Sequence, residues 1–112
     1  MKRAKPSMRE RKRYITFEII SKRTITYNEI KEHTFSHILE LIGEKGVSLA
    51  RPRLIKNLWN DKTQSGVLRV HPEYVNDVKV AQTLIRRIGQ KQVIVKTGNV
   101  FGTLHKIKKG AS

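Results

Sequence analysis

The apolar residues of this chain change their spacing along the sequence, and this pattern restricts the fold more than any other feature. Apolar and polar residues alternate over 14–20, where Ile15, Phe17 and Ile19 share one face. This alternation is typical of a half-buried strand. Further strands are predicted at 53–58, 66–70 and 92–97, with a last short extended piece at 103–107.

A first helical segment follows the first strand. It begins with the capping-box residues Thr26 and Glu29 and is predicted to run to about Glu44, where Gly43 and Gly46 supply the stop. Five apolar residues are predicted to form its buried stripe: Ile30, Phe35, Ile38, Leu41 and Ile42.

A second helical segment is predicted from Pro72 to Gly89, because proline is favourable at the first helical position and glycine ends the run. The apolar residues at helical spacing in it are Tyr74, Val78, Ala81, Ile85 and Ile88. The order is therefore β-α-β-β-α-β. It predicts an α+β, ferredoxin-like (RRM-like) two-layer sandwich, in which both helices cover one face of a four-stranded antiparallel sheet and the other face is free.

Positive charge gathers at the two ends of the chain, whose formal net charge is +15 over 112 residues. Seven of the first thirteen residues are Lys or Arg, and residues 91–112 contain five lysines and no acid. We expect a basic flexible arm at 1–12, a single domain at 13–108 and a tail at 109–112. Such charge density opposes compaction unless a polyanion neutralises it, and nucleic acid is the commonest polyanion.

Two groups of candidate binding residues follow from this pattern. The cations predicted to contact RNA phosphates are Arg9, Arg11, Lys12, Arg13, Lys106, Lys108 and Lys109. The predicted anchors for a protein partner are Ile94, Phe101 and Trp59. Ile94 is predicted on the free sheet face, and aromatic residues such as Phe101 and Trp59 are enriched at interface cores. Base stacking on the free sheet face is not expected, since Tyr14 is the only aromatic residue predicted to face outward there.

Catalytic and metal-binding patterns are weak. The chain has no cysteine, which excludes thiolate chemistry. His33 and His37 have a spacing that could grip a metal but lack a third ligand, and Glu73 and Asp77 are explained by the helix dipole. The glycine-bracketed segment 98–102 predicts a tight reversal or a bulge. We therefore predict no catalytic residue and no metal or cofactor bound by this chain.

No apolar stretch is long enough to span a bilayer, and the cationic N-terminus lacks the apolar region of a signal peptide. A cytoplasmic location is therefore expected, with no membrane partner.

Several segments, in this order and spacing, resemble the family of archaeal ribonuclease P protein component 2, related to the eukaryotic Pop-type subunit shared by ribonucleases P and MRP. The segments are Arg9–Ser21, Leu54-Ile55, Gly66–Arg69, Val93–Thr97 and Gly102–Leu104. Together they extend through nearly the whole chain.

The resemblance implies a non-catalytic subunit of an endoribonuclease whose active site is in its RNA. In that family the RNA subunit, with bound Mg²⁺, cleaves the 5′ leader from precursor tRNA, and component 2 works with component 3 as a heterodimer or a dimer of heterodimers. The chain stops soon after Lys109, so any C-terminal partner helix is expected to be short or absent. The alternatives are a stand-alone RNA-binding protein of ribosomal type and, less favoured, a small metal-dependent nuclease.

Overall fold

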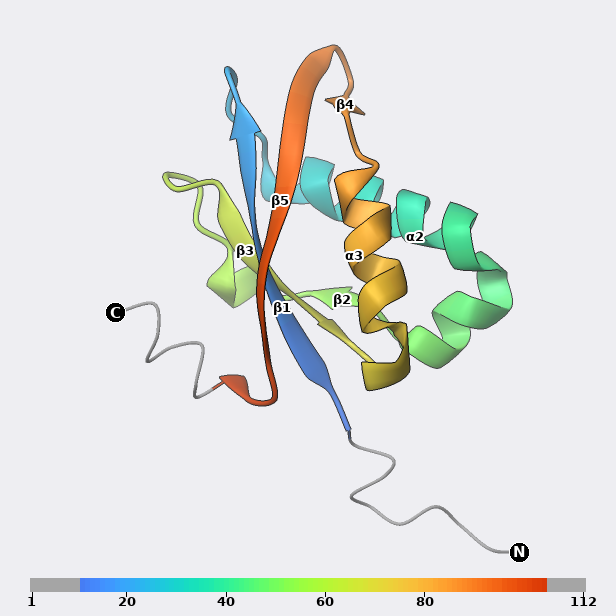
Figure 1. The fold of residues 1–112 in the computed structure, drawn as a ribbon. Helices are drawn as coiled ribbons and strands as arrows, with labels where there is room; N and C mark the ends of the chain where they lie inside the picture. The colour runs from blue at the N-terminus through green and yellow to red at the C-terminus, as the bar shows by residue number, and fades with distance from the viewer. Residues whose placement is uncertain (1–10, 105–112) are drawn as a thin grey trace, which may run out of the picture.

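A five-stranded antiparallel sheet forms one layer of the fold and two helices on one of its faces form the other (Figure 1). The computed structural model describes residues 11–104. The elements are β1 (Arg13–Ser21), α2 (Tyr27–Ala50), β2 (Arg53–Leu54), η1 (Lys56–Leu58), β3 (Ser65–Val70), η2 (Pro72–Tyr74), α3 (Val75–Thr83), β4 (Arg87–Ile88) and β5 (Lys91–Phe101). The strand order is β2-β3-β1-β5-β4. The predicted α+β sandwich is confirmed, but the sheet has five strands instead of four. The additional strand is β4, a two-residue strand that pairs with β5.

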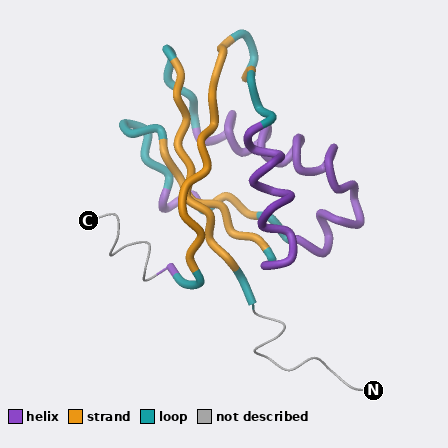
Figure 2. Tube along the Cα trace, in the orientation of Figure 1, coloured by secondary structure: helices purple, strands orange, loops and turns teal. Residues whose placement is uncertain are grey.

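The central strand is β1, which pairs with β3 on one side and with β5 on the other. Its predicted inner residues Ile15, Phe17 and Ile19 are all buried beneath the helices. Leu68 of β3 lies opposite Ile15, and Val95 of β5 lies opposite Ile19. The alternation in the sequence therefore identifies the core face of the sheet correctly. Both helices lie on one side of the strands (Figure 2).

The predicted start of α2 is confirmed, but its predicted end is wrong. The Thr26 hydroxyl accepts from the Glu29 amide at 3.2 Å, and the Glu29 carboxylate accepts from the Thr26 amide at 3.0 Å. Gly43 has a φ of 76° and a ψ of 175°, which kinks the helix without ending it. Beyond the kink the chain resumes helical geometry as far as Ala50, because this last turn buries Ala50 in the core.

The buried stripe of α2 differs in part from the prediction. Phe35 and Leu41 are exposed, which corrects their assignment to the core. Thr34, which the pattern passed over, is buried instead, because it shares the inward face with residues four positions before and after it. The predicted stripe residues that do contact the core are Ile30, Ile38 and Ile42.

The second predicted helix is too long. Residues 72–74 form a 3₁₀ turn, and α3 ends at Thr83 instead of near Gly89. Ile85 and Ile88 are buried as expected, but Ile85 lies in the connection and Ile88 lies in β4. Gly89 adopts a φ of 64°, which allows the tight turn from β4 into β5.

The second predicted strand is too long as well. β2 contains only Arg53 and Leu54, because the chain then turns into η1. The predicted hairpin with β3 is confirmed, since Leu54 lies opposite Leu68. The extended piece predicted at 103–107 lies largely outside the described residues, and its first two residues belong to no strand.

A tight reversal or a bulge is predicted for the segment 98–102, and the structure contains a bulge. The pairing of β1 with β5 shifts register between Ile15 and Phe17, so Thr16 faces two residues of β5. A Cβ on Gly98 would lie 2.6 Å from the Thr16 Oγ1, so only glycine fits there without a shift. β5 therefore runs past the predicted residue 97.

The outer sheet face is not free along its whole length, contrary to the prediction. Tyr14 and Val67 form a second small core there, and Tyr14 is only 9% exposed. The apolar residues that pack against this pair are Ile55, Leu58, Phe101 and Leu104. A base could not stack on Tyr14 without displacing them.

The predicted arm falls almost entirely outside the described residues, as does the tail at 109–112; only Arg11 and Lys12 of the arm precede β1 in the structure. Among residues 11–104, neither helix is long and apolar enough to cross a membrane.

Candidate nucleic-acid interface

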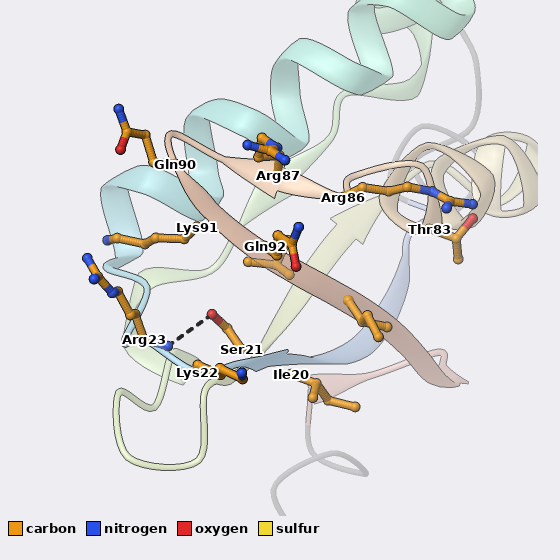
Figure 3. A pocket seen from close by; sticks show the side chains of 12 residues that line it. Ile20, Ser21, Lys22, Arg23, Thr83, Arg86, Arg87, Gln90, Lys91 and Gln92 are labelled. Carbon is orange, nitrogen blue, oxygen red and sulfur yellow. Dashed lines mark hydrogen bonds between the residues drawn. The ribbon is translucent and has the colours of Figure 1, made fainter.

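A groove of about 1060 Å³ lies between the end of β1 and the turn that joins β4 to β5 (Figure 3). Five of its lining residues are Lys or Arg and none is Asp or Glu. These cations are Lys22, Arg23, Arg86, Arg87 and Lys91. We call this feature the basic groove.

Three chain segments bring these cations together. The antiparallel pairing places Ser21 of β1 opposite Val93 of β5, so the residues after β1 lie beside the β4–β5 turn. The Ser21 hydroxyl accepts a hydrogen bond from the Arg23 amide at 3.2 Å (Figure 3). Arg86 and Arg87 follow the end of α3 and complete the groove from its other side.

Lys91 is the one cation of the basic groove that is neutralised within the described chain. Its Nζ lies 3.1 Å from the Glu29 Oε2 and donates to the Thr24 carbonyl at 3.3 Å. The backbone amide of Thr26 and then the Lys91 ammonium hold the pKa of Glu29 below its ordinary value. Among residues 11–104 this is the only salt bridge, so the other four groove cations remain available for an anionic ligand.

An apolar strip continues the groove onto the outer sheet face. Ile20 of β1 and Ile94 of β5 lie directly opposite each other and are 49% and 59% exposed. Glu18 and Lys96 form the next pair on the same face. The predicted partner residue Ile94 therefore belongs to an exposed apolar pair that itself lines the basic groove.

The predicted RNA-binding cations lie elsewhere. Arg11 and Lys12 are exposed just before β1, and Arg13 is half-buried at its first residue, opposite Val70. They are at the opposite end of β1 from the groove. The remaining predicted cations, which lie outside the described residues, are Arg9, Lys106, Lys108 and Lys109.

Sequence reasoning missed the basic groove because its cations are scattered over three segments. The signal that could have found them is a pair of doublets: Lys22-Arg23 follows the first strand, and Arg86-Arg87 follows α3, which ends earlier than predicted. Doublets at two element ends can meet only if those ends share one edge of the fold, and the strand order supplies that information.

The two predicted aromatic anchors are both half-buried. Trp59 stacks on Phe17 with ring centroids 6.3 Å apart, and its Nε1 donates to Asp61 at 2.7 Å. Phe101 lies opposite Tyr14 and packs in the second core. Each therefore supports the fold, whatever it contributes to an interface.

The candidate metal ligands His33, His37, Glu73 and Asp77 do not form a metal centre. The Nδ1 of His37 lies 2.9 Å from the His33 carbonyl, which explains this pair within one helix. Glu73 lies in η2 and Asp77 lies in the first turn of α3. Among residues 11–104, no three His, Cys, Asp or Glu side chains are grouped closely enough to hold a metal ion.

The sequences of known proteins related to this chain agree with a nucleic-acid role. The sequence profile of the Rpp14/Pop5 family matches residues 13–112. Three relatives are each named ribonuclease P protein component 2. The protein of Pyrococcus horikoshii is 36% identical over 109 residues, which cover 97% of this chain and 89% of that protein. The protein of Archaeoglobus fulgidus is 33% identical over 97% of this chain and 95% of its own length. The protein of Methanocaldococcus jannaschii is 33% identical over 96% of this chain and 78% of its own length.

These names favour neither the ribosomal-type protein nor the metal-dependent nuclease. The resemblance inferred from the ordered segments is confirmed, and this chain belongs to the Rpp14/Pop5 family.

Proposed function

We propose that this chain is a non-catalytic protein subunit of a ribonuclease P of archaeal type, and that it binds the RNA subunit. The observation that carries the proposal is the basic groove, five cations with no acid, in a member of the Rpp14/Pop5 family. In this proposal the RNA and its Mg²⁺ cleave the precursor tRNA, and this chain contacts the precursor only indirectly. The proposed location is the cytoplasm.

Two surfaces would contact the RNA backbone. The cations Arg11 and Lys12 of the arm precede β1 and Arg13 begins it, whereas the basic groove lies at the far end of this strand. β1 has nine residues, so these ends are separated by about 27 Å. Each cation that neutralises a phosphate releases counterions, which supports affinity without reading sequence.

The partner surface is proposed at the apolar pair Ile20 and Ile94. Exposed apolar pairs beside strong positive charge favour burial in a protein interface. Component 3 of the same enzyme is the proposed partner, in a heterodimer or a dimer of heterodimers. Phe101 and Trp59 are half-buried, and we propose that the exposed part of each side chain also contacts this partner.

The salt dependence of binding tests the groove. In the variant Arg23→Ala/Arg86→Ala/Arg87→Ala, each lost phosphate contact should flatten the log–log dependence of RNA affinity on salt by about 0.7–0.9. Alanine at Arg9, Arg11, Lys12 and Arg13 should flatten it by about three. Filter binding to the ribonuclease P RNA between low and moderate salt measures both slopes.

The matched control removes three other cations, Lys45, Lys62 and Lys79, which do not line the basic groove. Its slope should remain close to that of the unaltered chain. Equal flattening by the control and the groove variant would mean that only total charge matters, and the groove would lose its assigned role.

Catalysis is tested separately. The purified chain with Mg²⁺ should leave precursor tRNA intact, whereas addition of the RNA subunit should produce the mature 5′ end. Cleavage by the chain alone that disappears in Glu73→Gln or Asp77→Asn would overturn the non-catalytic assignment.

A further inference from the structure

A second pocket, of about 740 Å³, lies at the β2 edge of the sheet, away from the basic groove. We call it the β2-edge pocket. We propose that it holds one unpaired nucleotide of RNA, with the base against Phe35 and the phosphate on the surrounding cations. This inference rests on the proposed function, because it assumes that the partner is RNA.

The charge of the pocket favours an anionic ligand. Four of its lining residues are cations and none is an acid; the cations are Lys31, Arg53, Lys56 and Arg69. Arg53 of β2 lies directly opposite Arg69 of β3. Like charges in directly opposite positions destabilise a sheet, and no salt bridge involves either arginine within the described chain. A bound phosphate would remove this repulsion.

The apolar surface of the pocket fits a flat ring. Phe35 is 46% exposed although it is a large aromatic residue on the pocket wall. Ile38, Leu54 and Leu68 are buried residues that also line the pocket and provide an apolar floor. Aromatic side chains with neighbouring cations are the usual elements of single-strand binding, since every base has a face that can stack.

Two polar groups at the pocket, the Thr34 hydroxyl and the Lys31 ammonium, could form hydrogen bonds or ion pairs with a bound nucleotide. The Thr34 Oγ1 is fully enclosed, in a residue only 2% exposed, and has no hydrogen-bond partner among the described residues. Thr34 lines the pocket, so a rotation of its side chain about the Cα–Cβ bond would turn this hydroxyl toward a base edge or a ribose hydroxyl. The Lys31 Nζ lies 5.9 Å from the centre of the Tyr27 ring, which keeps this ammonium at the pocket wall.

The fold keeps this pocket open at the sheet edge. β2 is only two residues long, and the Tyr27 hydroxyl donates to the Leu54 carbonyl at 2.9 Å. This bond caps the strand edge with a side chain, which a further strand would have to displace. A nucleotide inserted beside Tyr27 needs no such displacement.

The test uses two probes, a labelled single-stranded hexaadenylate and a 16-base-pair RNA duplex. Phe35→Leu should weaken hexaadenylate binding about tenfold, with an unchanged salt slope because no cation is lost. Thr34→Val should also weaken it, without lowering the melting temperature, since it removes only an unpaired buried hydroxyl. Neither variant should change duplex binding. The matched control is Leu39→Ala, an exposed apolar change on the same helix that does not line the pocket.

The outcomes separate this inference from the proposed function. If Phe35→Leu and Thr34→Val bind hexaadenylate as the unaltered chain does, while the chain still binds ribonuclease P RNA, the nucleotide pocket is wrong and the proposed function stands. If the chain binds neither RNA, the proposed function fails and the pocket assignment fails with it. Displacement of hexaadenylate by hexaglutamate at equal concentration would overturn the inference in favour of an acidic protein segment.

Discussion

The Nζ of Lys91 lies 3.1 Å from both carboxylate oxygens of Glu29, so a cation of the basic groove is bonded to the capping box that begins α2. Glu29 accepts from the Thr26 amide at the same time. The start of the long helix and one wall of the basic groove therefore share a single carboxylate.

This carboxylate predicts an acid-sensitive contribution to stability. The pKa of Glu29 is lowered from 4.5, first by the Thr26 amide and then by Lys91. A lowered folded-state pKa stabilises the fold above the unfolded value, and this stabilisation is lost as pH falls through the folded-state value. Glu29→Gln should therefore lower the unfolding free energy at pH 7 and make it less dependent on pH below about 4.5. Urea unfolding at several pH values measures this.

Two further variants give the scale and the control for that prediction. Thr26→Ala removes the hydroxyl of the cap and should cost about 1 kcal/mol. Glu40→Gln changes an exposed carboxylate on the same helix and should leave the acid sensitivity intact. A Glu29→Gln variant with the pH profile of the unaltered chain would contradict the role of this carboxylate.

Gly66 predicts a defined packing defect. A Cβ at this position would lie 2.9 Å from Trp59 and 3.1 Å from Phe17, the two rings that stack on each other. Gly66→Ala should therefore destabilise the fold by about 1–3 kcal/mol and shift the fluorescence of Trp59, the only tryptophan of the chain. Gly102→Ala is the control, because nothing lies within 4 Å of its added Cβ. Equal emission spectra for Gly66→Ala and the unaltered chain would contradict this packing.

Phe101 should contribute to the stability of the fold even in the absence of a partner. It is half-buried against Tyr14 in the second core, so Phe101→Ala should lower the unfolding free energy by about 2 kcal/mol. Phe101→Leu keeps most of the apolar volume and should cost clearly less. An unchanged urea midpoint for the alanine variant would mean that the ring is not part of the second core in solution.

The sequence predicts the elements of this fold better than their lengths. Alternation correctly identifies the inner face of β1, and the capping box locates the start of α2. Helical spacing cannot distinguish a helix from a helix followed by a strand, so the pattern places Ile88 in the second helix although it lies in β4. Gly43 kinks α2 but does not end it as predicted, because whether the chain resumes a helix depends on tertiary contacts made by Ala50.

The candidate site is less predictable, because it depends on which strands are neighbours. Charge counts direct attention to the two ends of the chain, whereas the basic groove is made by cations from its middle, such as Arg23 and Arg86. The β2-edge pocket depends on Phe35, which is predicted to be buried but is exposed, and on Thr34, which is buried although the apolar pattern does not include it. Local periodicity fails there because the inward face of α2 is set by packing against the sheet.

Gln82 predicts a stabilising substitution. It is fully buried in α3, and neither its amide nitrogen nor its amide oxygen has a hydrogen-bond partner among the described residues. Unpaired buried polar groups destabilise a fold, and an apolar residue of similar shape removes that cost. Gln82→Met should therefore raise the unfolding free energy by about 1–3 kcal/mol, measured as a higher urea midpoint with an unchanged slope. Gln82→Glu is the opposite control and should destabilise strongly, since it buries a charge without a partner. A Gln82→Met variant less stable than the unaltered chain would show that the amide is bonded in solution and supports the core.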